Sequence, residues 1–188
     1  MTKKTQMARL ERANQMADAL KAETDRGRAC VGDAMLDEVF LDLFRKGFID
    51  EENDVAGMLG QGQPLGNYGA RLKLAHLLGW IGPEAYADCQ LIHRIRNRMA
   101  HELDVETFDH PRVRDLLDNL ESPRHVTIHI KGKPHRLNLK RRQDKFIVAV
   151  QLSLLRCWWF IDHRQPVKPG VDPPILRMPK PEELTSPG

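Results

Sequence analysis

Apolar side chains recur every three or four residues over most of this 188-residue chain. This spacing gathers them on one face of an α-helix. The segment 26–47 shows it clearly, because Leu36, Phe40 and Leu43 fall on one broad apolar face. The segment 142–163 is apolar on nearly all sides, which predicts a helix buried within a bundle or in a dimer interface. Altogether the spacing predicts helices over residues 6–22, 26–47, 65–79, 83–102, 111–120 and 142–163.

A different pattern begins after Ser122 and Pro123. Residues 125–130 and 135–139 alternate in character on either side of the sequence Lys-Gly-Lys-Pro. Strict alternation is typical of β-strands, and a short Gly-containing connection between two such runs is typical of a hairpin. The predicted fold is therefore all-α, mainly a helical bundle, with a small β-hairpin near 125–139.

Turn and cap signals place the ends of several helices. Thr24 and Asp25 offer an N-cap before the second helix, and Asp109 offers one before Pro111. The stretch from Phe48 to Pro64 is polar and contains several glycines, so it predicts a loop with one short helical turn at 55–59.

The length and the composition favour one domain with appendages. Residues 1–24 are predicted to form an N-terminal helical arm, and residues 25–163 a single helical bundle with the hairpin inserted at 124–140. Seven prolines follow Arg164, so residues 164–188 are predicted to be an extended or disordered tail.

Composition also excludes several classes of protein. The chain has 41% hydrophobic and 29% charged residues, and it has no apolar run near the roughly 20 residues that a membrane helix needs. The three cysteines lie far apart in helical segments, as expected of buried thiols in a reducing cytoplasm. The basic first residues lack the apolar core of a signal peptide. We therefore expect a cytoplasmic protein that does not contact membranes.

The most informative stretch is LIHRIRNRMAHEL, residues 91–103. Its spacing puts Arg96 within an apolar stripe, and a guanidinium there must be paired because it cannot lose its proton. Asp37 or Glu38 could supply the supporting carboxylate, although both could equally be solvated acids. His101 is rotated by roughly 140° from Arg96 on an ideal helix. The two side chains would meet only if the last turn unwound, or across a dimer.

These residues resemble a known pattern. Arg96, Asn97 and His101 resemble the Arg-x(4–6)-His motif of the HEPN superfamily, whose helical domains often dimerise and in many members cut or bind RNA. The wider context resembles the mannitol operon repressor (MtlR) family. The segments that carry this second resemblance are DRGRACVGDAMLDEVFLDLF (25–44), PLGNYGARLKLAHLLGWI (64–81), EAYADCQLIHRIRNRMAH (84–101) and TFDHPRVRDLL (107–117).

The two resemblances imply two functions. The MtlR resemblance implies a negative transcriptional regulator or co-regulator of a sugar-alcohol operon that acts through contacts with a partner protein, since no DNA-reading helix-turn-helix is evident. The HEPN resemblance implies a homodimeric, metal-independent ribonuclease or toxin, with an antitoxin as its partner. In that enzyme His101 would be the general acid or base, Arg96 would stabilise charge, and Asn97 would orient the phosphate or His101. Arg96 and Asn97 could instead only pin the bundle. No cofactor and no metal site is expected from the scattered histidines.

The segment 124–145 is strongly basic, with eight Lys or Arg residues against Asp144 alone, whereas the whole chain has a net charge of +3. Such a cluster could bind the phosphates of RNA or DNA, or it could only protect strand edges from aggregation. A homodimer is expected from the aromatic surface near Trp158 and Trp159. The candidate nucleic-acid-binding residues are Lys131, Lys133, Arg136, Lys140, Arg141 and Arg142.

Overall fold

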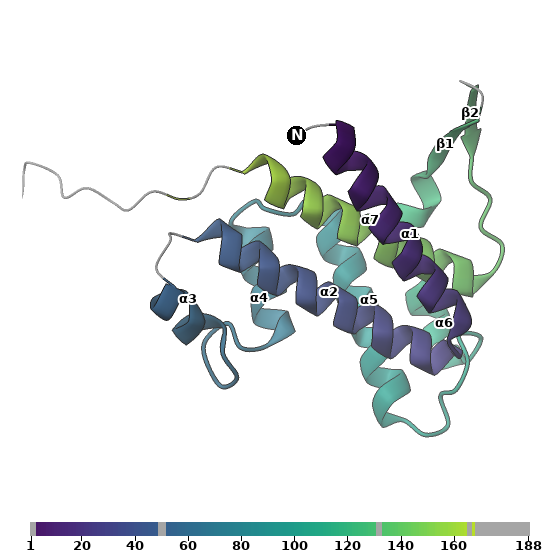
Figure 1. Ribbon diagram of the computed structural model, residues 1–188. Helices are drawn as coiled ribbons and strands as arrows, with labels where there is room; N and C mark the ends of the chain where they lie inside the picture. The colour runs from purple at the N-terminus through teal and green to yellow at the C-terminus, as the bar shows by residue number, and fades with distance from the viewer. Residues whose placement is uncertain (1–2, 49–51, 131–132, 165–166, 168–188) are drawn as a thin grey trace, which may run out of the picture.

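The computed structural model describes residues 3–48, 52–130, 133–164 and 167, and the fold in these ranges is mainly helical. The prediction of an all-α bundle with one hairpin is confirmed (Figure 1). The helices are α1 (Lys3–Ala22), α2 (Asp25–Gly47), α3 (Glu52–Leu59), α4 (Tyr68–Leu77), α5 (Pro83–His101), α6 (Pro111–Asp118), the 3₁₀ helix η1 (Ser122–His125) and α7 (Arg142–His163); the strands are β1 (Thr127–Ile130) and β2 (Lys133–Arg136).

The centre of the bundle is formed by α2, α5 and α7, which pack against one another. Helix α1 packs along α7, while α4 and α6 pack against α5 (Figure 1). Side chains spaced three or four apart fill the shared core, among them Phe40, Phe44, Ile92 and Phe146, each of them fully buried. The predicted apolar face of α2 and the nearly all-round burial of α7 follow from this central position.

Helix α1 shares this core, because Ala13 and Leu20 are almost completely buried. Its Arg9 guanidinium forms an ion pair with Asp162 of α7, with 3.0 Å between Nη2 and Oδ1. Both Arg9 and Arg12 also lie over the ring of Trp158. The division of the chain at residue 24 stays a prediction, and the proline-rich segment lies outside the described residues apart from Arg164 and Val167.

Local sequence explains most helix ends. The hydroxyl of Thr24 accepts a hydrogen bond from Gly27 N at the start of α2, and the side chain of Asn67 accepts one from Ala70 N at the start of α4. After α4, Gly79 adopts a positive φ of 68°, the conformation that favours glycine beyond a helix end.

Two local predictions were wrong. The N-cap of α6 is His110 and not Asp109, because the Asp109 carboxylate is occupied by the guanidinium of Arg142. Helix α3 has eight residues where one turn was expected. Its start was missed because Asn53 and Asp54 are exposed and polar, so apolar spacing gives no signal there.

The hairpin is confirmed but shorter than predicted. Strands β1 and β2 are antiparallel and pair Thr127 with Arg136. His125, which was predicted to begin the first strand, belongs instead to η1, which has Pro123 in its first turn. Figure 1 shows the two strands projecting from the helical body. Within the described ranges, none of the helices is both long and apolar enough to cross a membrane.

The connection from α6 to the hairpin is fixed by a buried carboxylate. Asp88 of α5 is fully buried, and its two oxygens accept hydrogen bonds from the backbone N–H groups of Glu121 and Ser122, each at 2.8 Å. Buried donors without partners are costly, so this carboxylate determines where η1 attaches to α5.

We predict that Asp88→Ala lowers the free energy of unfolding by about 1–3 kcal/mol, because both N–H groups lose their acceptor in a buried site. The matched control is Asp115→Ala on α6, where the side chain is 74% exposed; we expect a change of less than about 0.5 kcal/mol there. Urea unfolding followed by circular dichroism measures both. Equal losses in the two variants would contradict this role for Asp88.

Candidate functional site

Arg96 lies at the edge of the buried face of α5. The core positions of the helix are Cys89, Ile92, Ile95 and Met99, while the Arg96 side chain is 37% exposed. The sequence analysis placed Arg96 within the apolar stripe, and this was wrong because Ile95 takes the buried position one residue earlier. The guanidinium can therefore remain partly hydrated.

Arg96 faces Asp33 of α2, not Asp37 or Glu38 as predicted. Its Nε lies 3.7 Å from Asp33 Oδ2, and its Nη1 donates a hydrogen bond to Asn97 Oδ1 at 2.8 Å. The Asp33 side chain is only 9% exposed and also contacts Nδ1 of His93 at 3.0 Å. Arg96 and Asn97 thus belong to one small polar cluster between α2 and α5.

The two predicted acids have other surroundings. Asp37 lies one turn further along α2, where it forms an ion pair with Arg71 of α4, and Glu38 is exposed. Arg71 is almost completely buried and also donates a hydrogen bond to Leu65 O at 2.6 Å. Arg71 is therefore the arginine that needs a carboxylate partner. This role for Arg71 was not among the sequence predictions, although Arg71 lies one helical turn before the buried Ala75 of its helix.

His101 is exposed at the last position of α5 and is not brought to Arg96 within the chain. The helix stays regular to its end, because Glu102 N still donates a hydrogen bond to Arg98 O at 2.9 Å. On a regular helix the two side chains project about 140° apart. In the described part of the structure, the His101 side chain has no hydrogen bond or ion pair.

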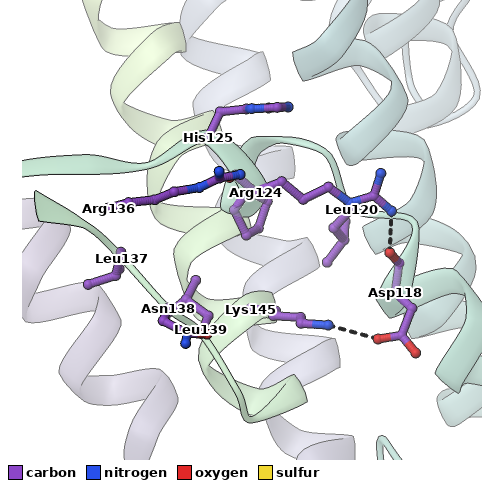
Figure 2. A pocket seen from close by; sticks show the side chains of 10 residues that line it. Asp118, Leu120, Arg124, His125, Arg136, Leu137, Asn138, Leu139 and Lys145 are labelled. Atoms are coloured by element: carbon purple, nitrogen blue, oxygen red, sulfur yellow. Dashed lines mark hydrogen bonds and ion pairs between the residues drawn. The ribbon is translucent and has the colours of Figure 1, made fainter.

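A second candidate site is the groove between the hairpin and helices α6 and α7, which we call the hairpin groove. It encloses about 590 Å³ and is lined by both cationic and apolar side chains (Figure 2). Lys145 of α7 enters it and pairs with Asp118 of α6, with 2.9 Å between Nζ and Oδ1. The cationic or titratable lining residues are Arg124, His125, Arg136 and Lys145, and the apolar ones are Leu120, Pro123, Leu137 and Leu139.

Several of the charges around the hairpin groove are neutralised inside the protein. The ammonium of Lys145, followed by the guanidinium of Arg142, lowers the pKa of Asp118. Arg142 is held by both Asp118 and Asp109, which leaves it poorly placed to bind a phosphate. Arg124 pairs with Glu121.

The remaining predicted phosphate-binding residues differ in their surroundings. Arg136 donates a hydrogen bond to the carbonyl of Arg124 at 2.8 Å and contacts no carboxylate within the described residues. Lys133, Lys140 and Arg141 likewise have no ion pair with the described part of the chain. Lys131 lies outside the described residues. The available positive charge therefore lies on the hairpin and on the segment that leads to α7.

Two thiols lie in the core. Burial raises the pKa of Cys89 to about 11 and also raises the pKa of Cys157, so both thiols are protonated at neutral pH. All three cysteines are free. No group of three potential metal ligands occurs among the described residues.

Comparison with known proteins gives two similarities. Residues 14–156 match the family model described as mannitol repressor, MtlR. The chain is also similar to the X-ray structure of the MtlR–HPr complex from Escherichia coli, with a TM-score of 0.56 and 23% sequence identity. That similarity covers 79% of this chain and 97% of the other, and it shows a shared fold. No curated protein matches the sequence.

We predict that Arg71→Met destabilises the protein by about 1–3 kcal/mol, because Leu65 O loses its buried donor and Asp37 loses its cation. Arg96→Met is the matched variant, and it should cost less than about 1 kcal/mol because this ion pair is long and partly exposed. Thermal and urea unfolding of both proteins would measure the difference. A larger loss for Arg96→Met would contradict this assignment.

Proposed function

Because the chain belongs to the mannitol repressor family, we propose that it is a negative regulator of a sugar-alcohol operon that acts by binding another protein. The family match over residues 14–156 carries this proposal, since it includes all of α2 to α6, the hairpin and most of α7. A relationship to the HEPN superfamily remains a prediction that rests on the spacing of Arg96, Asn97 and His101.

The structure of the Escherichia coli protein supports a protein partner, because it was solved as a complex with HPr. We extend this to the present chain and propose a protein similar to HPr as its partner. In this proposal the chain acts as a co-regulator and need not carry its own DNA-reading helix. A cytoplasmic location and a homodimer are further parts of the proposal that follow from the sequence alone.

The hairpin groove is the surface that we propose for this contact. The part-exposed Leu137 and Leu139 can be buried by a partner. Arg136 of the groove, and Lys140 and Arg141, which directly follow its lining residue Leu139, can attract an acidic surface and orient it. The same charges could instead bind a nucleic acid. The neutralisation of Arg142 and Lys145 inside the protein favours the protein partner, because a continuous row of free cations along the groove is lacking in the described residues.

The enzyme alternative has less support. A ribonuclease would need Arg96 and His101 around one phosphate, but Arg96 lies beside Asp33 and His101 lies exposed at the helix end. The two residues would have to come from different protomers. We therefore prefer a structural role for Arg96 and Asn97 in joining α5 to α2.

We predict that the purified protein binds purified HPr and that Arg136→Glu combined with Lys140→Glu weakens this binding by about tenfold or more. Arg94→Glu combined with Lys73→Glu is the matched control, since both side chains are exposed and lie outside the hairpin groove. Isothermal titration calorimetry at low and moderate salt measures the affinities.

Three outcomes would count against the proposal. Absence of HPr binding at high micromolar concentration would exclude this partner. Equal weakening by the control pair would exclude the hairpin groove as the contact surface. Tight, salt-dependent binding of RNA or duplex DNA that the groove variant abolishes, without HPr binding, would favour the nucleic-acid alternative.

A further inference from the structure

An apolar groove lies at the opposite end of the bundle from the α5–α6 connection, where the C-terminal ends of α2 and α7 meet α3 and α4 (Figure 1). We call it the Trp80 groove. It encloses about 400 Å³ and is bounded mainly by apolar side chains. The apolar ones are Phe48, Val55, Met58, Leu78, Trp80 and Val167, and the two charged lining residues are Asp54 and Arg164, which form no ion pair with each other.

The floor of the Trp80 groove is firmly packed. The ring of Trp80 lies 4.9 Å from that of Phe44 and 5.6 Å from that of Phe160, measured between centroids. Gly47 passes so close beneath the indole that a Cβ there would lie 2.5 Å from Trp80 Cη2. The groove is therefore a preformed surface, which lowers the entropic cost of filling it.

The walls of the Trp80 groove leave apolar area in water. Met58 is 39% exposed, Leu78 47% and Val167 42%. Arg164 also borders the groove, with its guanidinium 4.0 Å from the centroid of the Trp80 ring. Within the described part of the chain this guanidinium has no carboxylate partner. A ligand for the groove should therefore be apolar and carry one acidic group.

The sequence that follows Val167 has this chemistry. Val167 is the last described residue, and the chain continues as KPGVDPPILRM, residues 168–178. Pro169 and Gly170 are the residues that a type II turn prefers at its two central positions. Such a turn would direct the chain back towards Val167 and Arg164, which both border the groove.

The segment begins beside the groove, because Val167 itself lines it. Pro173 and Pro174 favour an extended chain of about 3.1 Å per residue, so Asp172 to Leu176 spans about 12 Å. Ile175 and Leu176 are adjacent apolar side chains in an otherwise polar or proline-rich segment. Prolines on both sides of this pair reduce the entropy that the segment loses on binding.

We propose that residues 171–178 bind in the Trp80 groove of their own chain. Ile175 and Leu176 cover Met58 and Leu78, and Asp172 pairs with Arg164. The covalent link gives the segment an effective concentration of about 1 mM or more, so modest contacts are enough. Residues 171–178 are then an internal ligand of the Trp80 groove, and any partner protein that uses the groove must first displace them.

Trypsin provides a specific test on the full-length protein. Lys168 and Lys180 are each followed by proline, which blocks cleavage, so Arg177 is the one readily cleaved site within residues 168–188. We expect cleavage after Arg177 to be about tenfold slower than in a free peptide of residues 168–188, because the bound segment must open first. Mass spectrometry of timed samples measures the rate.

Two variants locate the contact. Ile175→Ser combined with Leu176→Ser should restore the rate of the free peptide, whereas Leu184→Ser, outside the proposed segment, should leave the rate unchanged. Met58→Asp should also speed cleavage, and its control is Leu77→Asp, an exposed apolar position outside the Trp80 groove. Combining Met58→Asp with the double serine change should not raise the cleavage rate above that of either variant, because both remove the same interaction.

The outcomes separate the possible occupants. Slow cleavage that is independent of protein concentration and lost in the Met58 and double serine variants supports the proposal. Cleavage as fast as in the free peptide overturns it. Protection that increases with protein concentration also overturns it, because the segment would then bind a second copy of the chain.

Discussion

The cost of burying charge is the constraint on which the rest of this structure depends. A charged group that leaves water must be paired or hydrogen-bonded, because the desolvation penalty otherwise exceeds the stability of a small domain. Within the described residues each buried charge has at least one partner outside its own helix, so each one joins two parts of the bundle. The buried charged residues are Arg28, Asp33, Arg71 and Asp88.

Most of these hydrogen bonds and ion pairs involve residues of helix α2. Arg28 donates a hydrogen bond to Leu20 O at 2.9 Å, which closes the turn between α1 and α2. Asp25 accepts a hydrogen bond from Phe108 N at 2.8 Å and so anchors the segment before α6. The carboxylate of Asp33 contacts His93 and Arg96 of α5. Arg96, the arginine of the candidate nuclease motif, is thus one of the residues that connect α5 to α2.

Helices were most predictable where apolar spacing extends over several turns. Helices α2 and α7 were predicted almost to the residue because each buries a broad face.

The partner of Arg96 was not predictable in the same way. Apolar spacing identifies which face of α2 is buried, but it does not tell which turn of that face lies opposite Arg96. Asp33 and Asp37 are one turn apart, and the packing angle between the helices decides between them. The prediction of the α6 N-cap was wrong for a related reason. The carboxylate of Asp109 accepts a hydrogen bond from Arg142, a residue distant in the sequence.

We propose that Arg96 and His101 do not form a catalytic pair and that the protein acts through contacts with another protein. The most direct measurement incubates the purified protein at high concentration with structured and single-stranded RNA, without added metal, beside a folded His101→Ala variant. The account predicts that both proteins leave the RNA intact. Cleavage by the wild type that falls by about 10²-fold or more in the His101→Ala variant would contradict it, because that is the loss expected on removing a general acid or base.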